Sequence, residues 1–165
     1  LWVYRELYTQ KITADIFAKK VLDLESGEYI RYGVLDASTW ARRGDIGPSI
    51  AETMIQAGCR WRPSDRTGRS RISGKLEIHK RLKVEDKEPG IRIFSNCRNL
   101  LRTFPTLPLD DSNPEDINTH VEDHAYDALR YGCMSRPIHT SYANKAFGNS
   151  NRTANFVPSD KIFGY

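Results

Sequence analysis

The most informative stretch of the chain, residues 121–132, reads VEDHAYDALRYG. On a helix, Asp123 and Asp127 lie one turn apart on the same face, and His124 forms a second pair with Asp127 at i,i+3. The apolar residues of the stretch fall on another side, so the helix can bury one face and hold its carboxylates at the rim. Like charges one turn apart repel, and a bound cation would reverse that repulsion. The stretch therefore resembles half of a metal site.

A structural interpretation competes with this one. Acidic residues in the first turn of a helix also act as N-caps or favourable partners of the helix macrodipole. Glu122 and Asp123 fit that role by position alone. Both interpretations stay open at this point.

Composition places the chain among ordinary soluble proteins. Its 165 residues suit one domain with a real core, and 39% hydrophobic with 28% charged residues is typical of a globular protein. We find no apolar run long enough for a membrane span or a signal peptide, so a soluble intracellular protein is expected. The three cysteines are widely spaced, which favours buried, reduced thiols.

Positive charge is concentrated in one segment. Residues 58–83 hold nine basic and two acidic residues, a surplus of seven, while the whole chain carries +4. Arginine binds phosphate by bidentate hydrogen bonds as well as by charge, so this segment is a candidate DNA-binding surface. A solvated helix face that maintains solubility is the alternative. The candidate DNA-binding residues are Arg60, Arg62, Arg66, Arg69, Arg71 and Lys75.

The rest of the chain alternates between strand and helix patterns. Strands are expected at residues 1–8, 29–35, 59–62 and 91–94. Helices are expected at residues 13–24, 48–58, 70–83 and 96–104, and around Asp123. Strands separated by helices indicate an α/β layered sheet. Residues 137–165 lack periodicity and are expected to form a tail that is extended, disordered or docked on a partner.

Asp36 follows directly after the expected strand 29–35. In α/β sheets, ligands bind at the carboxyl ends of strands, so Asp36 occupies a natural position for a site. If the Asp123 helix crosses that end, its carboxylates can join Asp36 on Mg²⁺ or Mn²⁺. Two such ions can activate a water and stabilise the leaving oxygen of a phosphodiester. No GxxxxGK[ST] phosphate-binding loop occurs in the chain.

Several motifs together resemble the C-terminal nuclease domain of tailed-bacteriophage terminase large subunits. They are YRELY at residues 4–8, LDAS at 35–38, GIRIF at 90–94 followed by Cys97, and EDHAYDALRY at 122–131, of which the last is the most specific. The resemblance implies an RNase H-like fold, a mixed sheet flanked by helices, over residues 1–136. It also implies a two-metal-ion endonuclease that cuts concatemeric double-stranded DNA during genome packaging.

Site roles follow from the resemblance residue by residue. Asp36 resembles the metal ligand at the end of the second strand, and Asp123 with Asp127 resemble the acidic pair on the closing helix. His124 matches a position where some relatives use imidazole as a ligand; it can equally orient a carboxylate or face solvent. Glu6 and Glu122 are candidates for residues that do not bind the metal themselves but contact the metal ligands and hold them in position.

The resemblance also implies partners and a location. The partners are a packaging ATPase domain preceding Leu1, the portal and the small terminase subunit, and the location is the cytoplasm of the infected bacterium rather than the mature virion. In the family, the first metal ligand is an Asp on a strand that would precede Leu1, so this first strand is missing from the sequence. Two alternatives stay open: another RNase H-like nuclease such as a resolvase or transposase core, and a non-catalytic DNA-binding or portal-docking module.

Overall fold

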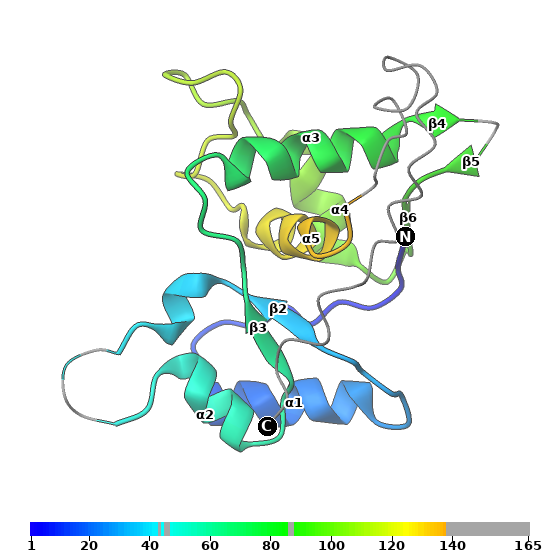
Figure 1. Ribbon diagram of the computed structural model, residues 1–165. Helices are drawn as coiled ribbons and strands as arrows, with labels where there is room; N and C mark the ends of the chain where they lie inside the picture. The colour runs from blue at the N-terminus through cyan, green and yellow to red at the C-terminus, as the bar shows by residue number, and fades with distance from the viewer. Residues whose placement is uncertain (43, 45–46, 86–87, 138–165) are drawn as a thin grey trace, which may run out of the picture.

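The computed structural model describes residues 1–42, 44, 47–85 and 88–137. Within these ranges the protein is a mixed α/β structure with five α-helices and three two-stranded sheets (Figure 1). The expected tail lies almost wholly outside the described residues.

All five expected helices are present. They are α1 (Ala14–Glu25), α2 (Ile50–Gln56), α3 (Ser70–Leu82), α4 (Arg98–Thr103) and α5 (His124–Met134). The capping box of α2 explains its sharp start, because the Ser49 hydroxyl accepts from the Glu52 N–H while the Glu52 carboxylate accepts from the Ser49 N–H. Two short 3₁₀ segments, η1 (Ala37–Trp40) and η2 (Phe104–Thr106), complete the helical elements described.

The strands are shorter than expected and pair in twos. They are β1 (Trp2–Val3), β2 (Gly33–Leu35), β3 (Trp61–Pro63), β4 (Val84–Glu85), β5 (Glu88–Pro89) and β6 (Arg92–Ile93). β1 pairs with β6 and β2 with β3, both parallel, while β4 and β5 form an antiparallel hairpin that the sequence pattern did not predict. The expectation of one strand over residues 1–8 is wrong beyond Val3, because an extended segment becomes a strand only where its backbone finds a partner.

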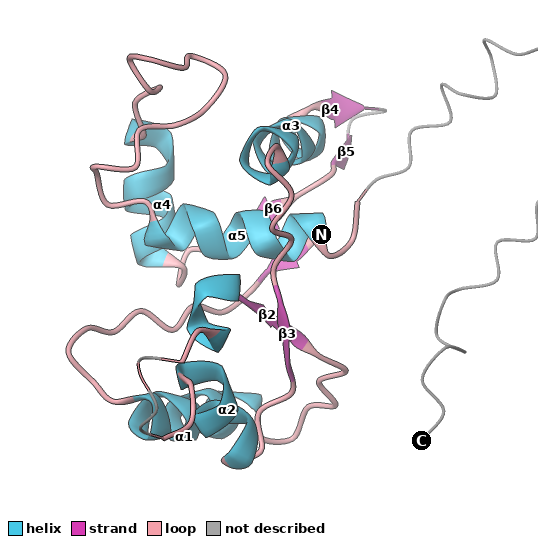
Figure 2. Cartoon of the chain, turned by 60° about the vertical axis from the view of Figure 1, so that its left-hand side comes forward, coloured by secondary structure: helices cyan, strands magenta, loops and turns pink. Residues whose placement is uncertain are grey.

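The β2–β3 pair lies between two groups of helices. In both views α1 and α2 lie on one side of this pair and α3, α4 and α5 on the other (Figures 1 and 2). α5 contacts β2, and α2 contacts β3. We call α1, α2, β2 and β3 the β2 half, and α3, α4 and α5 the α5 half.

Each half has its own core. The core of the α5 half is the larger; its buried residues are Ile78, Ile91, Cys97, Leu100, Ile117, Tyr126, Leu129 and Cys133. The core of the β2 half is formed by Ala18, Val21, Met54 and Cys59. All three cysteines are buried and unpaired, as predicted. In the described part of the chain, no helix has the length and apolar character needed to cross a bilayer.

Two glycines allow close packing at positions that bear on the site. A Cβ atom at Gly74 of α3 would lie 2.4 Å from Cγ of Arg130, so the absence of a side chain lets Arg130 of α5 pass beneath α3. At Gly33 of β2, a Cβ atom would lie 2.2 Å from the Trp61 ring on β3. The spacing of β2 and β3 therefore depends on a bare backbone at Gly33.

Candidate functional site

Asp36 lies at the carboxyl end of β2, where the sequence predicted it. One carboxylate oxygen accepts a hydrogen bond from the Ser38 N–H at 2.6 Å and so caps η1. The other accepts from the hydroxyl of Tyr131 on α5. Burial opposes ionisation of Asp36, but these two hydrogen bonds outweigh it and leave the pKa below its usual value. Asp36 is therefore an ionised carboxylate joined to α5.

Asp123 is the buried acid of the site. It occupies the N-cap position of α5 without making a side-chain capping bond, and it is only 7% exposed. Burial raises its pKa, and the charge of Asp127 raises it further. Asp123 thus has the N-cap position that the structural alternative gave it, but its carboxylate makes no capping hydrogen bond.

Asp127 faces the same side of α5 and is paired with Arg130. The guanidinium of Arg130 lies 2.9–3.0 Å from one Asp127 oxygen. The charge of Arg130 also acts on Asp36 and Tyr131. A chain of contacts therefore runs from Asp36 through Tyr131 and Arg130 to Asp127.

His124 lies on the outer side of the same turn. Its side chain is 81% exposed, and its Nδ1 is 3.7 Å from an Asp123 oxygen. It lines an apolar cavity of about 660 Å³ between α1, the N-terminal segment and α5. The structure brings the imidazole beside Asp123 and places it toward solvent, which agrees with the exposed-residue interpretation.

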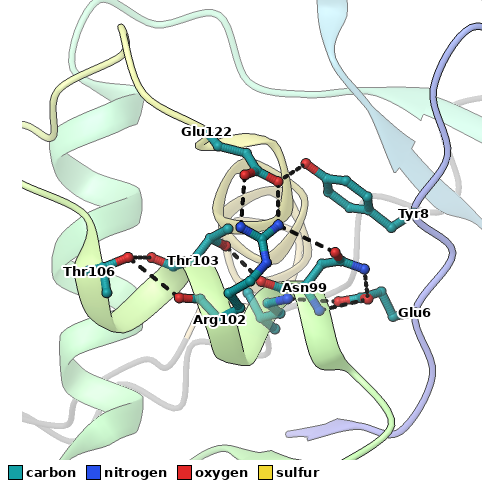
Figure 3. A network of polar contacts seen from close by, with 8 residues as sticks. Glu6, Tyr8, Asn99, Arg102, Thr103, Thr106 and Glu122 are labelled. Atoms are coloured by element: carbon teal, nitrogen blue, oxygen red, sulfur yellow. Dashed lines mark hydrogen bonds and ion pairs between the residues drawn. The ribbon is translucent and has the colours of Figure 1, made fainter.

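Glu6 and Glu122 belong to a polar network that also includes Tyr8, Asn99 and Arg102 (Figure 3). Glu6 accepts hydrogen bonds from the backbone N–H groups of Asn99 and Leu100 at 3.0 and 2.8 Å, so it fixes the start of α4. Glu122 binds Arg102 through both oxygens at 2.6 and 2.9 Å and accepts from the Tyr8 hydroxyl.

Arg102 first, and then Tyr8, lower the pKa of Glu122 to about 2. The network joins the N-terminal segment, α4 and the residue immediately before Asp123 (Figure 3). The network therefore acts on the candidate metal ligands by fixing the position of the chain just before Asp123.

Arg71 of α3 lies on the acidic side of the site. Its Nε donates to Asp116 at 2.8 Å, and the charges of Asp127 and Asp123 also act on it. Burial lowers the pKa of Arg71, but the bond to Asp116 and the nearby acids raise it overall. One terminal nitrogen of the guanidinium is buried without a hydrogen-bond partner. Arg71 thus acts as a counterion to the acids.

Three further predicted DNA-binding residues have different surroundings. Arg66 donates to the carbonyl of Ala37, and Lys75 donates to the carbonyls of Pro114 and Glu115. Arg69 is exposed at the N-cap position of α3. Arg66 and Lys75 therefore bind the chain's own backbone.

Arg60 and Arg62 of the predicted set stack on tyrosines. The Arg60 guanidinium lies over the Tyr29 ring, and that of Arg62 lies over the Tyr32 ring. Both arginines are exposed. The predicted basic surface therefore contains both cations bound to acidic or carbonyl groups of the chain and arginines stacked on tyrosines, of which Arg60 also donates to the carbonyl of Ile30 at 3.4 Å.

The donor set suits a hard divalent cation, because Asp36, Asp123 and Asp127 offer carboxylate oxygens. A bound cation would also reduce the repulsion between Asp123 and Asp127, which Arg130, Arg71 and His124 offset only in part. Within the described residues, however, no three His, Cys, Asp or Glu side chains converge as a metal-holding group. Arg71, Arg130 and Tyr131 contact or face the acids instead.

Sequence reasoning missed three members of this site. Tyr131 and Arg130 lie within the quoted stretch, and their helical spacing from Asp127 was the available clue. Asp116 lies in a loop rich in Pro and Asp, where no periodicity marks it. In comparisons with known proteins, no family model, curated protein or solved structure matches this chain at a significant level.

Proposed function

We propose that this chain is the nuclease domain of a viral DNA-packaging terminase large subunit, with an RNase H-like fold over residues 1–136. In this proposal it is a metal-dependent endodeoxyribonuclease that cuts concatemeric double-stranded DNA. Its partners are the packaging ATPase domain, the portal and the small terminase subunit, in the cytoplasm of an infected bacterium.

One observation carries the proposal: the Tyr131 hydroxyl of α5 hydrogen-bonds to Asp36 at the end of β2. This contact joins residues 95 positions apart and holds α5, the helix that carries Asp127 and begins after Asp123, against the end of β2. A carboxylate at a strand end and two more on the helix packed against it, beside a basic segment, would suit a polyanionic substrate whose cations the acids hold.

Asp36, Asp123 and Asp127 would hold two Mg²⁺ or Mn²⁺ ions, with His124 beside Asp123 as a candidate fourth ligand. The chemistry that such ions supply is activation of water and stabilisation of charge on the leaving oxygen. Tyr131 orients the Asp36 carboxylate, and Arg130 orients that of Asp127. The network of Glu122, Arg102 and Tyr8 holds the start of α5 in place.

Nicking of supercoiled plasmid tests the proposal. The protein is expected to nick and then linearise plasmid with Mn²⁺ or Mg²⁺, with little sequence preference, and to stop when EDTA is added. Asp36→Asn and Asp127→Asn are expected to reduce the rate by more than about 100-fold, since even residues that support metal ligands are worth 10- to 100-fold. Asp23→Asn, an exposed aspartate on α1, is the matched control and should retain the rate.

The other outcomes discriminate between functions. Cleavage that survives EDTA, or that neither substitution slows, would exclude the two-ion mechanism. Cleavage confined to branched DNA would support a resolvase-like nuclease. Plasmid binding without nicking in either metal would support a non-catalytic DNA-binding module.

A further inference from the structure

A second feature is formed by residues just before β2, residues at the start of β3 and a residue that follows α5. It consists of Tyr29, Tyr32, Arg60, Arg62 and Arg136, which we call the arginine–tyrosine strip. The Arg60 guanidinium lies 5.4 Å from the Tyr29 ring centroid, and those of Arg62 and Arg136 lie 4.3 and 5.7 Å from that of Tyr32. Arg136 also donates to the Tyr32 hydroxyl at 3.3 Å.

The strip is largely open to solvent, although Tyr32 is half-buried. Tyr29 is 84% exposed, although burial of aromatic surface is the main gain that such a ring offers folding. Arg60, Arg62 and Arg136 are exposed as well. An exposed ring with a guanidinium over one face leaves flat surface on which another planar group can stack.

The charge of the strip is not neutralised by nearby acids. The carboxylate of Asp65 accepts from the backbone N–H and hydroxyl of Thr67. Glu28, next to Tyr29 in sequence, binds Tyr4 and Arg5 instead. Among the described residues, no ion pair joins a carboxylate to any of the three arginines of the strip.

The strip leads to the candidate site. Tyr32 and Arg62 line a cavity of about 210 Å³ whose other walls include Ser64, Arg130 and Tyr131. Tyr131 is the residue that hydrogen-bonds to Asp36. A polymer lying along the strip would therefore approach the strand-end carboxylate.

We propose that the arginine–tyrosine strip binds an unpaired stretch of a nucleic acid strand. The bases stack on Tyr29 and Tyr32, and the phosphates contact Arg60, Arg62 and Arg136. Stacking requires an open base face, which a duplex hides in its interior, so the strip prefers single-stranded over double-stranded DNA. The delivery of this strand to Asp36 rests on the proposed nuclease function, but the binding itself does not.

Binding measured in EDTA tests the strip without any cleavage. The probes are a fluorescent 12-nucleotide oligo-dT and a duplex of the same length, titrated with protein and followed by anisotropy at several salt concentrations. We expect tighter binding of oligo-dT. Tyr29→Ala is expected to weaken it about 5- to 150-fold, the range for loss of one stacked base, while Tyr29→Phe keeps the affinity.

The arginines are tested through the salt dependence. Arg60→Gln is expected to lower the slope of log K against log salt by about 0.7, the value for one phosphate contact on a single strand. Arg98→Gln, an exposed arginine on α4, should leave the slope unchanged. Circular dichroism checks that each variant is folded. Because Tyr29 is exposed, its substitution is expected to leave the fold intact.

Several results would contradict the proposal that the strip binds single-stranded nucleic acid. They are equal affinity for the duplex and oligo-dT, unchanged binding by Tyr29→Ala, and displacement of oligo-dT by polyglutamate of equal charge. The last would indicate a site for acidic polypeptides. If the nuclease proposal is wrong, the binding results in EDTA still hold. If the strip proposal is wrong, metal-dependent nicking and its loss in Asp36→Asn are still expected.

Discussion

The two halves of the molecule treat charged side chains differently. The four buried ionisable residues with acid or guanidinium groups, Glu77, Arg81, Asp123 and Arg130, all lie in the α5 half of the described structure. The charged groups of the β2 half lie partly or fully in solvent. Burial of charge costs free energy unless each group finds a partner, so the α5 half pays in stability for an arrangement that holds acids in fixed positions.

The largest expected effect tests the buried pair of α3. Arg81 is 6% exposed, contacts Glu77 at 3.0 Å and donates to the Arg136 carbonyl. Arg81→Met leaves Glu77 buried without this partner, so the free energy of unfolding should fall by about 3–5 kcal/mol. For a chain of this length that lowers Tm by roughly 6–20 °C, measured by calorimetry.

A double variant provides the control for this pair. Replacing Glu77 by Leu in the Arg81→Met background removes both charges and should recover most of the lost stability. A single variant within about 1 kcal/mol of the wild type would show that the α5 half does not depend on this ion pair.

A smaller effect of opposite sign is expected at Asp123. Its folded-state pKa is raised by burial and by Asp127, whereas the unfolded value is about 3.9. As pH rises past 4 the unfolded chain ionises first, so ionisation of Asp123 weakens folding at neutral pH. Asp123→Asn should therefore raise Tm at pH 7 in EDTA, and the gain should vanish below about pH 4.

Differential scanning fluorimetry measures this difference, with the exposed Asp111→Asn as a control of unchanged Tm. A lower Tm for Asp123→Asn at pH 7 would mean that the buried carboxylate stabilises the fold. The comparison between the halves would then lose its energetic basis.

The smallest effect is expected in the β2 half, at the half-buried Glu52. Arg42 first, and then the Ser49 N–H, lower its pKa to about 2. A depressed pKa adds stability that is present above the unfolded value of about 4.3 and is lost as pH falls toward 2. The Tm difference between wild type and Glu52→Gln should therefore be small at pH 7 and disappear by pH 2.

Thermal unfolding at pH 7, 4 and 2 measures this, with Glu115→Gln as the exposed control. A difference at pH 7 as large as that of Arg81→Met would contradict the contrast between surface and buried charge.

Local patterns predicted the helices well. The expected helix at 13–24 differs from α1 by one residue at each end, and that at 70–83 differs from α3 by one residue at its end, because apolar spacing and caps are encoded within a few residues. Strand extent was predicted poorly. Tyr4 to Tyr8 have the composition of a strand, but their contacts are side-chain bonds to Glu28, α4 and Glu122.

The site divides in the same way. The positions of Asp36 after a strand and of Asp123 and Asp127 on a helix could be predicted, because strand ends and helical spacing are visible in the sequence. The hydrogen-bond partners of Arg66, Arg71 and Lys75 could not be predicted, since their acceptors lie 29 to 45 residues away in the sequence. In addition, Arg66 and Lys75 bind backbone carbonyls, which carry no sequence signal. Charge density alone cannot distinguish a cation bound to the protein from one facing solvent.

The contact between Gly33 and Trp61 has a consequence three residues further along the chain. Any side chain at position 33 must push the indole aside or separate the two strands. Because Asp36 follows directly after β2, a change in that separation would move its carboxylate relative to Tyr131. A methyl group added at Gly33 would thus change the orientation of the Asp36 carboxylate without touching it.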